Sequence, residues 1–329
     1  MTNGLPLTLS VRSLETGAIQ RIDTRAGTPG TPNGLSAVAV VSTLDNGVAD
    51  VAYAGDLYGN VWKFDLSAAT PADWKVAYGT AASPLPLFTA AAGQAITARP
   101  DITRFPKGGY LVAVGSGRYV DVGDNAAGST QAVYGLWDKG APVSLAQLQT
   151  QTIVGTAGAA GGTYRLSTHA VGPATDVALA GDNAIALSDY YASRRGWKLN
   201  LPSAGERVVT EAAIRNGRLV ISSLIPSTAV CTFGGDGWII DVDVATGNRT
   251  AALDTNGDGA IDDLDRLGGS VASAFRVGAV PAAATILRGS GSQRAMEYKM
   301  INTSNGSVVR VPEKGNPKVS RRSAWEQLQ

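Results

Sequence analysis

The stretch YAGDLYGNVWKFDLS, residues 53–67, contains the pattern on which the fold depends: a turn bearing Asp and Gly, followed by an apolar strand. Related patterns recur as SLETGAIQRI at 13–22 and GGDGWIIDVDVATGNRT at 234–250. In each, the strand adjoins a D-x-x-T-G turn or a relative of it. A strand, a tight Thr-Gly turn and a second strand form the outer hairpin of a propeller blade. A blade cannot bury both of its faces alone, so such repeats predict radially stacked sheets.

Short β-branched runs between Gly, Asn and Asp turns predict strands along most of the chain. These runs lie at 7–12, 37–43, 60–66, 110–115, 184–189, 218–224, 237–244 and 307–312. The best candidate for a helix is 144–151. Stretches 67–98, 119–131 and 138–162 are rich in Ala, Gly, Pro and Ser, and we expect them to be insertions that decorate one face.

The predicted fold class is therefore all-β, a modified β-propeller with quinoprotein-like blades and long loop insertions, formed by residues 1–329 as one domain. Propeller blades take roughly 40 to 50 residues each, which leaves room for about four or five blades here. A closed ring of blades would need residues upstream of Met1, so we expect the domain to be incomplete at its N-terminus.

Composition excludes several classes of function. The net charge of +1 gives no electrostatic footprint for nucleic acid or an anionic membrane. No apolar window approaches the roughly 18 residues of a membrane span, and the N-terminus lacks the pattern of a signal peptide. Cys231 is the only cysteine, so it is either a buried thiol or paired outside this chain, and His169 is the only histidine. Most zinc sites and catalytic triads are thereby excluded.

The stretch DTNGDGAIDDLD at 254–265 predicts a calcium site. Oxygen-bearing side chains alternate along it, as calcium loops require, because calcium takes six to eight oxygen ligands. A glycine at position 6 permits the sharp turn. The predicted ligands are the side chains of Asp254, Asn256, Asp258, Asp262 and Asp265 and the carbonyl of Ala260.

One position of this loop departs from the motif. Position 12 is Asp265 instead of the longer, bidentate Glu, which should weaken or reshape the site. The alternative is an acidic surface turn stabilised by its Asx and Gly residues. We expect the metal, if bound, to act as a structural staple and not as a catalyst.

Several other residues have structural interpretations. Asp56 and Asn60 are predicted to cap backbone amides of the first turn, with Trp62 wedged between blades. Trp137, Trp197 and Trp238 are predicted to lie in the core, whereas Trp74 is predicted to be exposed. His169 is predicted to be a satisfied surface or turn histidine. The small basic clusters, predicted to be solvated, are Arg194, Arg195 and Lys198, and Arg321 with Arg322.

The motifs, taken in order, resemble the PilC/PilY-type proteins, large adhesin-like factors of bacterial type IV pili. The stretch 53–67 is similar to that family's signature. The resemblance continues through PLFTAAAGQAITARPDI at 86–102, VAVGSGRYVDVGD at 112–124, QAVYGLWDKG at 131–140, the segment 196–231, the stretches GGDGWIIDVDVATGNR and DTNGDG, and SRRSAWEQL at 320–328. It covers about residues 35–329 and implies the C-terminal propeller domain of such a protein.

The resemblance implies a non-enzymatic factor in pilus biogenesis, twitching motility or surface attachment. Its partners would be pilus machinery proteins or pilin subunits, and a host surface is a further candidate. Its place would be the cell surface, the pilus or the outer membrane, reached through the periplasm by the full-length protein. Full-length members carry an exported N-terminal region with a von Willebrand A-like module, which this chain lacks.

The family also carries a nine-residue calcium loop just before its signature, and the matching positions here are 42–50, STLDNGVAD. Asn46 and Asp50 fit the pattern, but Ser42 and Leu44 replace two expected carboxylates and Asp45 is one step out of phase. Asp45, Asn46 and Asp50 are therefore weaker metal candidates. The loop is either a shifted site that uses Asp45 or a simple Asx turn.

A second hypothesis is an enzyme, a quinoprotein-type dehydrogenase, because similar turns occur in quinone-cofactor propellers. That hypothesis requires an active-site carboxylate and usually docking tryptophans at a regular period. The repeats here are irregular, and the tryptophans do not recur at a fixed period. We therefore predict a protein that is not an enzyme.

Overall fold

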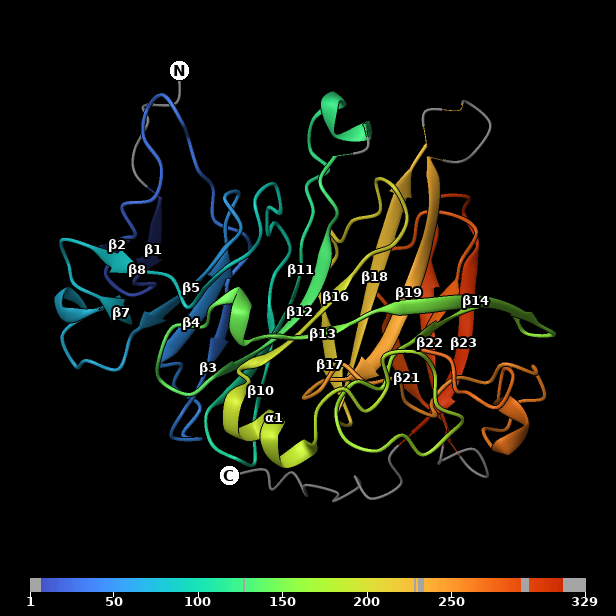
Figure 1. Cartoon of the computed structure of the whole chain (residues 1–329). Coiled ribbons are helices and arrows are strands. Elements are labelled where there is room, and N and C mark those ends of the chain that lie inside the picture. The colour runs from blue at the N-terminus through green and yellow to red at the C-terminus, as the bar shows by residue number, and fades with distance from the viewer. Residues whose placement is uncertain (1–6, 127, 228, 230–233, 291–295, 316–329) are drawn as a thin grey trace, which may run out of the picture.

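The computed structural model describes residues 7–126, 128–227, 229, 234–290 and 296–315. In that part of the chain, mainly antiparallel sheets are arranged one after another, from the blue N-terminal hairpin to the red C-terminal strands (Figure 1). The all-β prediction is confirmed. Cys231, the basic pair at 321–322 and the motif at 320–328 lie outside the described residues.

The N-terminal hairpin and the first sheet hold the residues from which the fold was predicted. The hairpin pairs β1 (Thr8–Arg12) with β2 (Ile19–Asp23) around the Thr-Gly turn. The first sheet has the order β3-β4-β5-β6, with β9 paired to β5. Its strands are β3 (Ala39–Val41), β4 (Val51–Gly55), β5 (Asn60–Asp65), β6 (Lys75–Val76) and β9 (Phe88–Thr89).

The second sheet has the order β10-β11-β12-β16-β13. Its strands are β10 (Asp101–Arg104), β11 (Tyr110–Gly115), β12 (Ala132–Asp138), β13 (Gln149–Gln151) and β16 (Gly196–Asn200). All seven residues of β12 are buried, which explains its continuous apolar run: both of its faces are covered by neighbouring sheets. The small β7 (Tyr78–Gly79) and β8 (Pro84–Leu85) form a separate hairpin.

The third and fourth sheets complete the array. The third has the order β14-β15-β20-β19-β18-β17 and the fourth β21-β22-β23. The third contains β14 (Ile153–Ala159), β15 (Gly162–Ser167), β17 (Ala213–Arg215), β18 (Arg218–Pro226), β19 (Gly235–Asp243) and β20 (Ala274–Arg276). The fourth contains β21 (Thr285–Arg288), β22 (Met296–Asn302) and β23 (Val308–Lys314).

Each pair of consecutive sheets shares an apolar core. One core joins the N-terminal hairpin to the first sheet, a second joins the first sheet to the second, a third joins the second to the third, and a fourth joins the third to the fourth. A sheet that is buried on both faces by its neighbours is the arrangement that the repeated hairpins predict. Trp137, Trp197 and Trp238 lie together in the third of these cores, as predicted.

Trp197 shows how closely these sheets approach. Its indole is fully buried and its Nε1 donates to the carbonyl of Val244 at 2.9 Å. A Cβ added to Gly135 would lie 2.3 Å from this ring, and one added to Gly247 would lie 2.5 Å from it. The two glycines therefore make the space in which the indole is sandwiched between the second and third sheets.

The turn at 56–60 has the predicted capping role. Asp56 is fully buried, and its Oδ1 accepts hydrogen bonds from the amides of Tyr58 and Asn60 at 2.9 and 2.8 Å. Its Oδ2 accepts from the Trp62 indole at 2.8 Å and from the side-chain amides of Asn33 and Asn60. One carboxylate thus fixes the turn and the orientation of the core tryptophan at the same time.

Two local predictions are wrong. The stretch 184–189 is not a strand, because α1 (Leu187–Ser193) begins within it and buries Tyr190 against the body of the protein. The expected helix at 144–151 is only a 3₁₀ turn, Leu145–Gln147, followed by β13. The predicted insertion 138–162 also contains the whole of β14, a strand in which Gly, Ala and Thr follow the first two residues and give little β-propensity signal.

Five side chains that were predicted to lie at the surface or in a turn are half-buried. Trp74 is half-buried against the first core, and its Nε1 donates to the carbonyl of Ala68 at 2.9 Å. The cluster of Arg194, Arg195 and Lys198 is also half-buried instead of fully solvated. His169 is half-buried beside Asp182, whose carboxylate accepts the backbone amide of His169 at 2.6 Å.

The segment after β15 is held down by one buried arginine. The guanidinium of Arg249 donates to both carboxylate oxygens of Asp176 and of Asp182, at 2.7 to 3.0 Å. Burial opposes ionisation of Asp182, but the hydrogen bonds from Arg249 prevail and lower its pKa to about 2. The ionised Asp182 carboxylate therefore stabilises the fold at pH values above 3.8, the ordinary pKa of an aspartate. This contribution to stability is lost as the pH falls toward 2.

Candidate functional site

The predicted calcium loop 254–265 lies between strands β19 and β20, not between two helices. Its end is a short 3₁₀ turn, Asp263–Asp265. The loop is fastened to the hairpin of β14 and β15, because the Tyr164 hydroxyl donates to the carbonyl of Asp254 at 3.0 Å and the amide of Gly161 to that of Thr255 at 3.0 Å. A helical calcium switch is thereby excluded for this loop.

The acidic side chains of this loop are turned toward its own backbone. Asp254 accepts from the amides of Gly257 and Gly259 at 2.7 and 2.9 Å. Asp265 accepts from the amides of Thr255 and Asp262, at 2.7 and 2.9 Å. Asn256, Asp258 and Asp262 each accept from the amide two residues further on, in successive Asx turns. Gly257 and Gly259 adopt φ values of +80° and +84°, as turns of this kind require.

Asp254 and Asp265 are buried, with 5% and 4% of their surface exposed. In the described part of the chain, no lysine or arginine forms an ion pair with either carboxylate. Burial, together with the negative charges of Asp254 and Asp265, raises the pKa of the nearby Tyr164 to about 12. These two buried carboxylates of the loop are therefore held by backbone amides and by no cationic side chain of the described residues.

The donor set of four carboxylates, one amide oxygen and one carbonyl suits calcium chemically. The acidic side chains are not gathered, however: among the described residues no three His, Cys, Asp or Glu side chains are grouped to hold a metal ion. Calcium binding at this loop therefore stays a prediction. It rests on the chemical type of the donors and on their negative charge, not on their arrangement.

The second candidate loop, 42–50, has a different geometry. Asp50 accepts from the amide and hydroxyl of Thr43, and Asn46 accepts from Ser42 and from the amide of Val48. Asp45 points outward to Arg104, with Oδ2 and Nη1 3.1 Å apart. The structure therefore does not bring Asp45, Asn46 and Asp50 together, and Asp45 is paired with the guanidinium of Arg104 instead.

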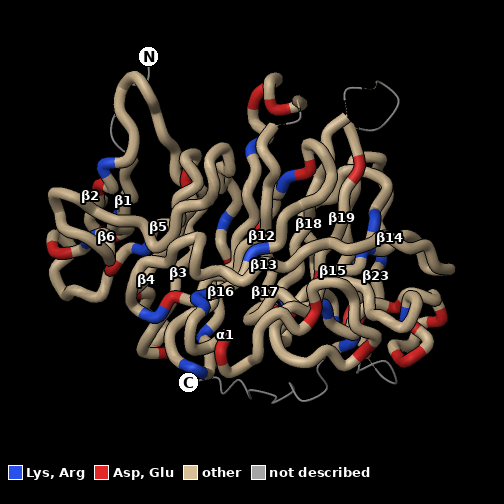
Figure 2. The backbone as a smooth tube through the Cα atoms, in the orientation of Figure 1, with Lys and Arg blue, Asp and Glu red and all other residues tan. Residues whose placement is uncertain are grey.

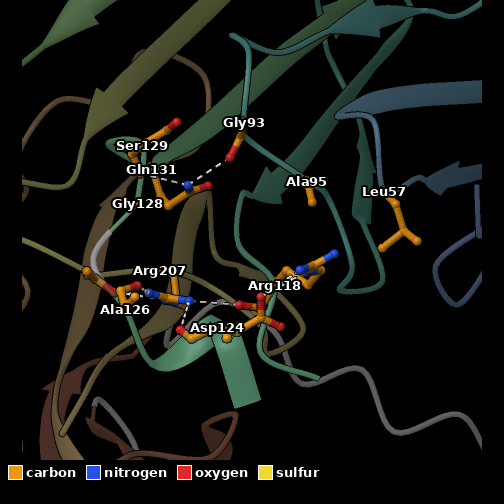
Figure 3. A pocket seen from close by; sticks show the side chains of 12 residues that line it. Leu57, Gly93, Ala95, Arg118, Asp124, Ala126, Gly128, Ser129, Gln131 and Arg207 are labelled. Carbon is orange, nitrogen blue, oxygen red and sulfur yellow. Dashed lines mark hydrogen bonds and ion pairs between the residues drawn. The ribbon is translucent and has the colours of Figure 1, made fainter. Parts of the chain in front are cut away.

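A cavity of about 330 Å³ lies beside the loop that follows β11 (Figure 3). No single stretch of the sequence indicates this cavity, because its walls come from three separate sheets. They include Leu57 of the β4–β5 turn, Arg118 and Gln131 at the two ends of the loop, and Arg207 before β17. The motif residues Gly-Arg at 117–118 and Gly-Glu-Arg at 205–207 were visible in the sequence, but only the fold shows that they meet.

Arg207 fixes the shape of this cavity. It is 7% exposed, and its guanidinium donates to four backbone carbonyls. They are those of Gly205 at 2.9 Å, Arg118 at 3.0 Å, Ala126 at 2.9 Å and Asp124. Three of these carbonyls belong to the loop 118–126, which is thereby fastened by a side chain from outside the loop, as Figure 3 shows. In Figure 1 this loop rises above the ends of the strands.

Charge is otherwise spread evenly. Figure 2 shows acidic and basic residues interspersed over the molecule, in keeping with the net charge of +1. Within the described part of the chain, no helix has the length and apolar character that a membrane crossing requires.

Consecutive antiparallel sheets packed face to face, with long loops between their strands, define a β-propeller protein. A family model described as the PilY1 beta-propeller domain matches residues 6–160. The chain belongs to the PilY1-type proteins, and the resemblance stated from its motifs is confirmed.

Known relatives and a solved structure agree with this assignment. The chain is 34% identical to the type IV pilus biogenesis factor PilY1 homolog of Xylella fastidiosa over 65% of its own length and 14% of that protein. It is 31% identical to PilY1 of Pseudomonas aeruginosa over 74% of its own length and 23% of that protein. The crystal structure of the P. aeruginosa PilY1 C-terminal domain matches with a TM-score of 0.71 and 25% identity, covering 94% of this chain and 66% of that one. The chain thus spans less than a quarter of the length of these curated relatives.

Proposed function

We propose that this propeller acts in type IV pilus biogenesis as a non-enzymatic factor. Its partners would be pilus machinery proteins or pilin subunits, and its role would extend to twitching motility or attachment to a host surface. The observation that carries the proposal is the likeness over 94% of the chain to a PilY1 C-terminal domain, joined to relatives that are named as pilus biogenesis factors. In the full-length protein the domain would reach the cell surface or outer membrane through the periplasm.

Deleting the region of the gene that encodes this domain should reduce surface pili and twitching zones, and a plasmid copy should restore both. Electron microscopy of pili and a subsurface twitching assay measure the two effects. Normal piliation in a deletion strain that lacks a second copy would contradict the proposal. Stoichiometric quinone binding with dye-linked substrate oxidation by the purified chain would instead favour a quinoprotein dehydrogenase.

We further propose that the 254–265 loop binds calcium as a structural staple. The supporting observations are two buried carboxylates without an ion-pair partner in the described part of the chain and a donor set of oxygens alone. The ligands would be the side chains of Asp254, Asn256, Asp258, Asp262 and Asp265 and the carbonyl of Ala260. A bound divalent cation would compensate the negative charge that the loop concentrates.

Calcium should raise the midpoint of thermal unfolding, because a ligand that binds only the folded state stabilises it by about 2.7 kcal/mol at a hundredfold excess over Kd. Asp258→Ala should remove the calcium-dependent part of the shift. Asp263→Ala is the matched control, since the Asp263 side chain is 91% exposed and pairs only with Arg266. Calorimetry should give one ion per chain if only this loop binds, and two if the 42–50 loop binds as well. No heat of binding and no response to a chelator would mean that the loop is only a turn.

A further inference from the structure

Lys299 of β22 holds a buried amine in contact with two carboxylates. Its side chain has no exposed surface, and its Nζ lies 2.5 Å from Oδ2 of Asp241 on β19 and in contact with Oε2 of Glu313 on β23. Figure 1 shows β22 and β23 beside β19, so strands of two neighbouring sheets meet at this amine. A lysine amine that loses its proton is a nucleophile, and the carboxyl carbon beside it is an electrophile.

The surroundings of these side chains are apolar. Residues two positions apart in a strand lie on the same face of the sheet. The neighbours at that spacing from the charged residues are buried in the core between the third and fourth sheets: Val220, Ile239, Ile301 and Val311. Because the side chains of Lys299, Asp241 and Glu313 have no exposed surface, bulk water does not reach them. A closed, dry site protects a product that water would otherwise hydrolyse.

Two carboxylate oxygens at this site have no partner. Oδ1 of Asp241 and Oε1 of Glu313 are buried and accept no hydrogen bond from any described residue. Arg218 contacts the other two oxygens, Oδ2 of Asp241 at 3.2 Å and Oε2 of Glu313 at 3.1 Å. The oxygens Oδ2 and Oε2 therefore lie close to each other and to the amine of Lys299. Burial raises the pKa of Glu313, so Glu313 is the carboxyl that holds a proton most readily.

We propose that Lys299 and Asp241 join in an amide bond within the folded chain, with Glu313 as the proton carrier. The bond would link Nζ of Lys299 to Cγ of Asp241, and therefore β22 of the fourth sheet to β19 of the third. This modification goes beyond the proposed role in pilus biogenesis and rests on none of its assumptions. The ion pairs hold the reacting groups in place until the bond forms.

The reaction is a condensation that needs no further reactant. A proton first passes from Nζ of Lys299 to Oδ2 of Asp241, which gives a neutral amine and a carboxylic acid. Nζ then attacks Cγ of Asp241. Glu313 takes a second proton from Nζ and donates its own to Oδ2, which departs as water. One C–N bond forms and one C–O bond breaks, Oδ1 stays as the amide oxygen, and Glu313 is regenerated.

The product also balances the charges of the cluster. The amide removes one cation and one anion, and it leaves Arg218 paired with Glu313. Buried charges are costly even when they are paired, so the loss of two of them favours the amide. Proximity favours it further, since groups that are held in a reactive geometry reach effective molarities of roughly 10⁵–10⁸ M.

A second buried lysine contact in the chain lacks the proton carrier. Nζ of Lys63 lies 2.7 Å from Oδ2 of Asp138, but the other donors to this carboxylate are the hydroxyls of Tyr53 and Tyr78. Burial raises the pKa of both hydroxyls, so neither exchanges its proton readily. Among the described residues, Lys63 forms an ion pair with Asp138 alone. We therefore expect no amide at Lys63, which makes this pair an internal control.

Intact mass spectrometry of the purified 329-residue chain tests the proposal. We expect a mass that is lower than the mass calculated from the sequence by one water molecule. A tryptic digest should contain a branched peptide that joins the segment with Asp241 to the segment with Lys299. Trypsin should not cleave after Lys299, because it does not cleave after an acylated lysine, whereas it should cleave normally after Lys63.

Two variants separate the nucleophile from the proton carrier. Lys299→Arg keeps the positive charge but replaces the amine, and Glu313→Gln keeps both reacting groups but removes the carboxyl that moves the protons. Both variants should have their full calculated mass. Lys63→Arg is the matched control, because it changes the other buried lysine, and it should keep the deficit of one water molecule. Thermal unfolding should confirm that all three variants fold.

A parent chain with its full calculated mass would overturn the proposal, whether or not the variants fold. So would a water deficit that persists in Lys299→Arg, or a branched peptide in which the partner of Lys299 is a carboxyl other than that of Asp241. A deficit that persists unchanged in Glu313→Gln would refute the role of Glu313 as the proton carrier.

Discussion

Lys299→Met should lower the free energy of unfolding by about 3–5 kcal/mol, the effect expected when one partner of a buried ion pair is removed. The side chain of Lys299 is fully buried, and its Nζ lies 2.5 Å from Oδ2 of Asp241 and in contact with Oε2 of Glu313. Methionine keeps the length of the side chain but not its charge. Within the described part of the chain, Arg218 would then be the one cation left to two buried carboxylates.

The four charges form a closed cluster between the third and fourth sheets. Arg218 of β18 contacts Asp241 of β19 at 3.2 Å and Glu313 of β23 at 3.1 Å, while Lys299 comes from β22. Burial opposes ionisation of Asp241, but Lys299 and Arg218 prevail and lower its pKa. Burial raises the pKa of Glu313, and the same cations offset this only in part. Glu313 is therefore the member that would be the first to take up a proton in the variant.

Urea denaturation followed by tryptophan fluorescence measures the loss. Lys75→Met is the matched control, because Lys75 is exposed on β6 and should change stability by at most about 0.5 kcal/mol. Adding Glu313→Gln to Lys299→Met should recover part of the loss, since it removes one of the uncompensated charges. Equal stability of the Lys299 and Lys75 variants would refute a role for this cluster in joining the two sheets.

A second large effect is expected from Asp138→Ala, also about 3–5 kcal/mol. Asp138 ends β12 and is 1% exposed. Its carboxylate accepts from the hydroxyls of Tyr53 and Tyr78, each at 2.6 Å, and lies 2.7 Å from Nζ of Lys63. Two side chains of the first sheet and one of the β7–β8 hairpin thus converge on one carboxylate of the second sheet. Removing it leaves a largely buried ammonium, the buried hydroxyl of Tyr53 and the half-buried hydroxyl of Tyr78 without their acceptor.

Thermal and urea unfolding of the variant should be compared with those of Glu211→Ala. Glu211 forms an ion pair with Arg99, but both side chains are about half exposed, so its loss should cost at most about 1 kcal/mol. The double variant Asp138→Ala with Lys63→Met should be more stable than Asp138→Ala alone. If Asp138→Ala lowered the free energy of unfolding no more than Glu211→Ala does, the packing of the first sheet on the second would not depend on Asp138.

The parts of the fold that could be predicted are those that local chemistry decides. The Asp-Gly turn at 56–59 and the Thr-Gly turn at 246–247 impose their geometry on neighbouring residues only, so the strands beside them were placed correctly. The D-x-x-T-G turn leads into a single bridge, Val242 to Arg249, and not into the full second strand that was expected. The geometry of the turn is set by the residues of the turn itself. The length of the strand after it depends instead on the strands that pair with it, which lie elsewhere in the sequence.

Contacts between distant segments account for what could not be predicted. The stretch 187–193 is helical although its first residues read as a strand, because Tyr190 is buried and its hydroxyl donates to the carbonyl of Ala245, 55 positions away. The cavity beside Arg207 and the cluster around Lys299 join residues that are about 80 positions apart or more in several cases. No periodicity or motif spacing reports such pairs.

The way in which Arg207 holds the loop 118–126 has a consequence for sequence change. Three of its four acceptors are backbone carbonyls of this loop, which every amino acid possesses, so apart from Asp124, which accepts the amides of Val120 and Asp121, the path of the loop depends little on the side chains along it. Val120 and Val122 are 78% and 85% exposed, and their side chains carry none of these contacts. Substitutions at these two positions can therefore alter what the rim of the cavity touches while its shape is kept. One buried arginine makes the rim a place where binding preference can diversify without a new fold.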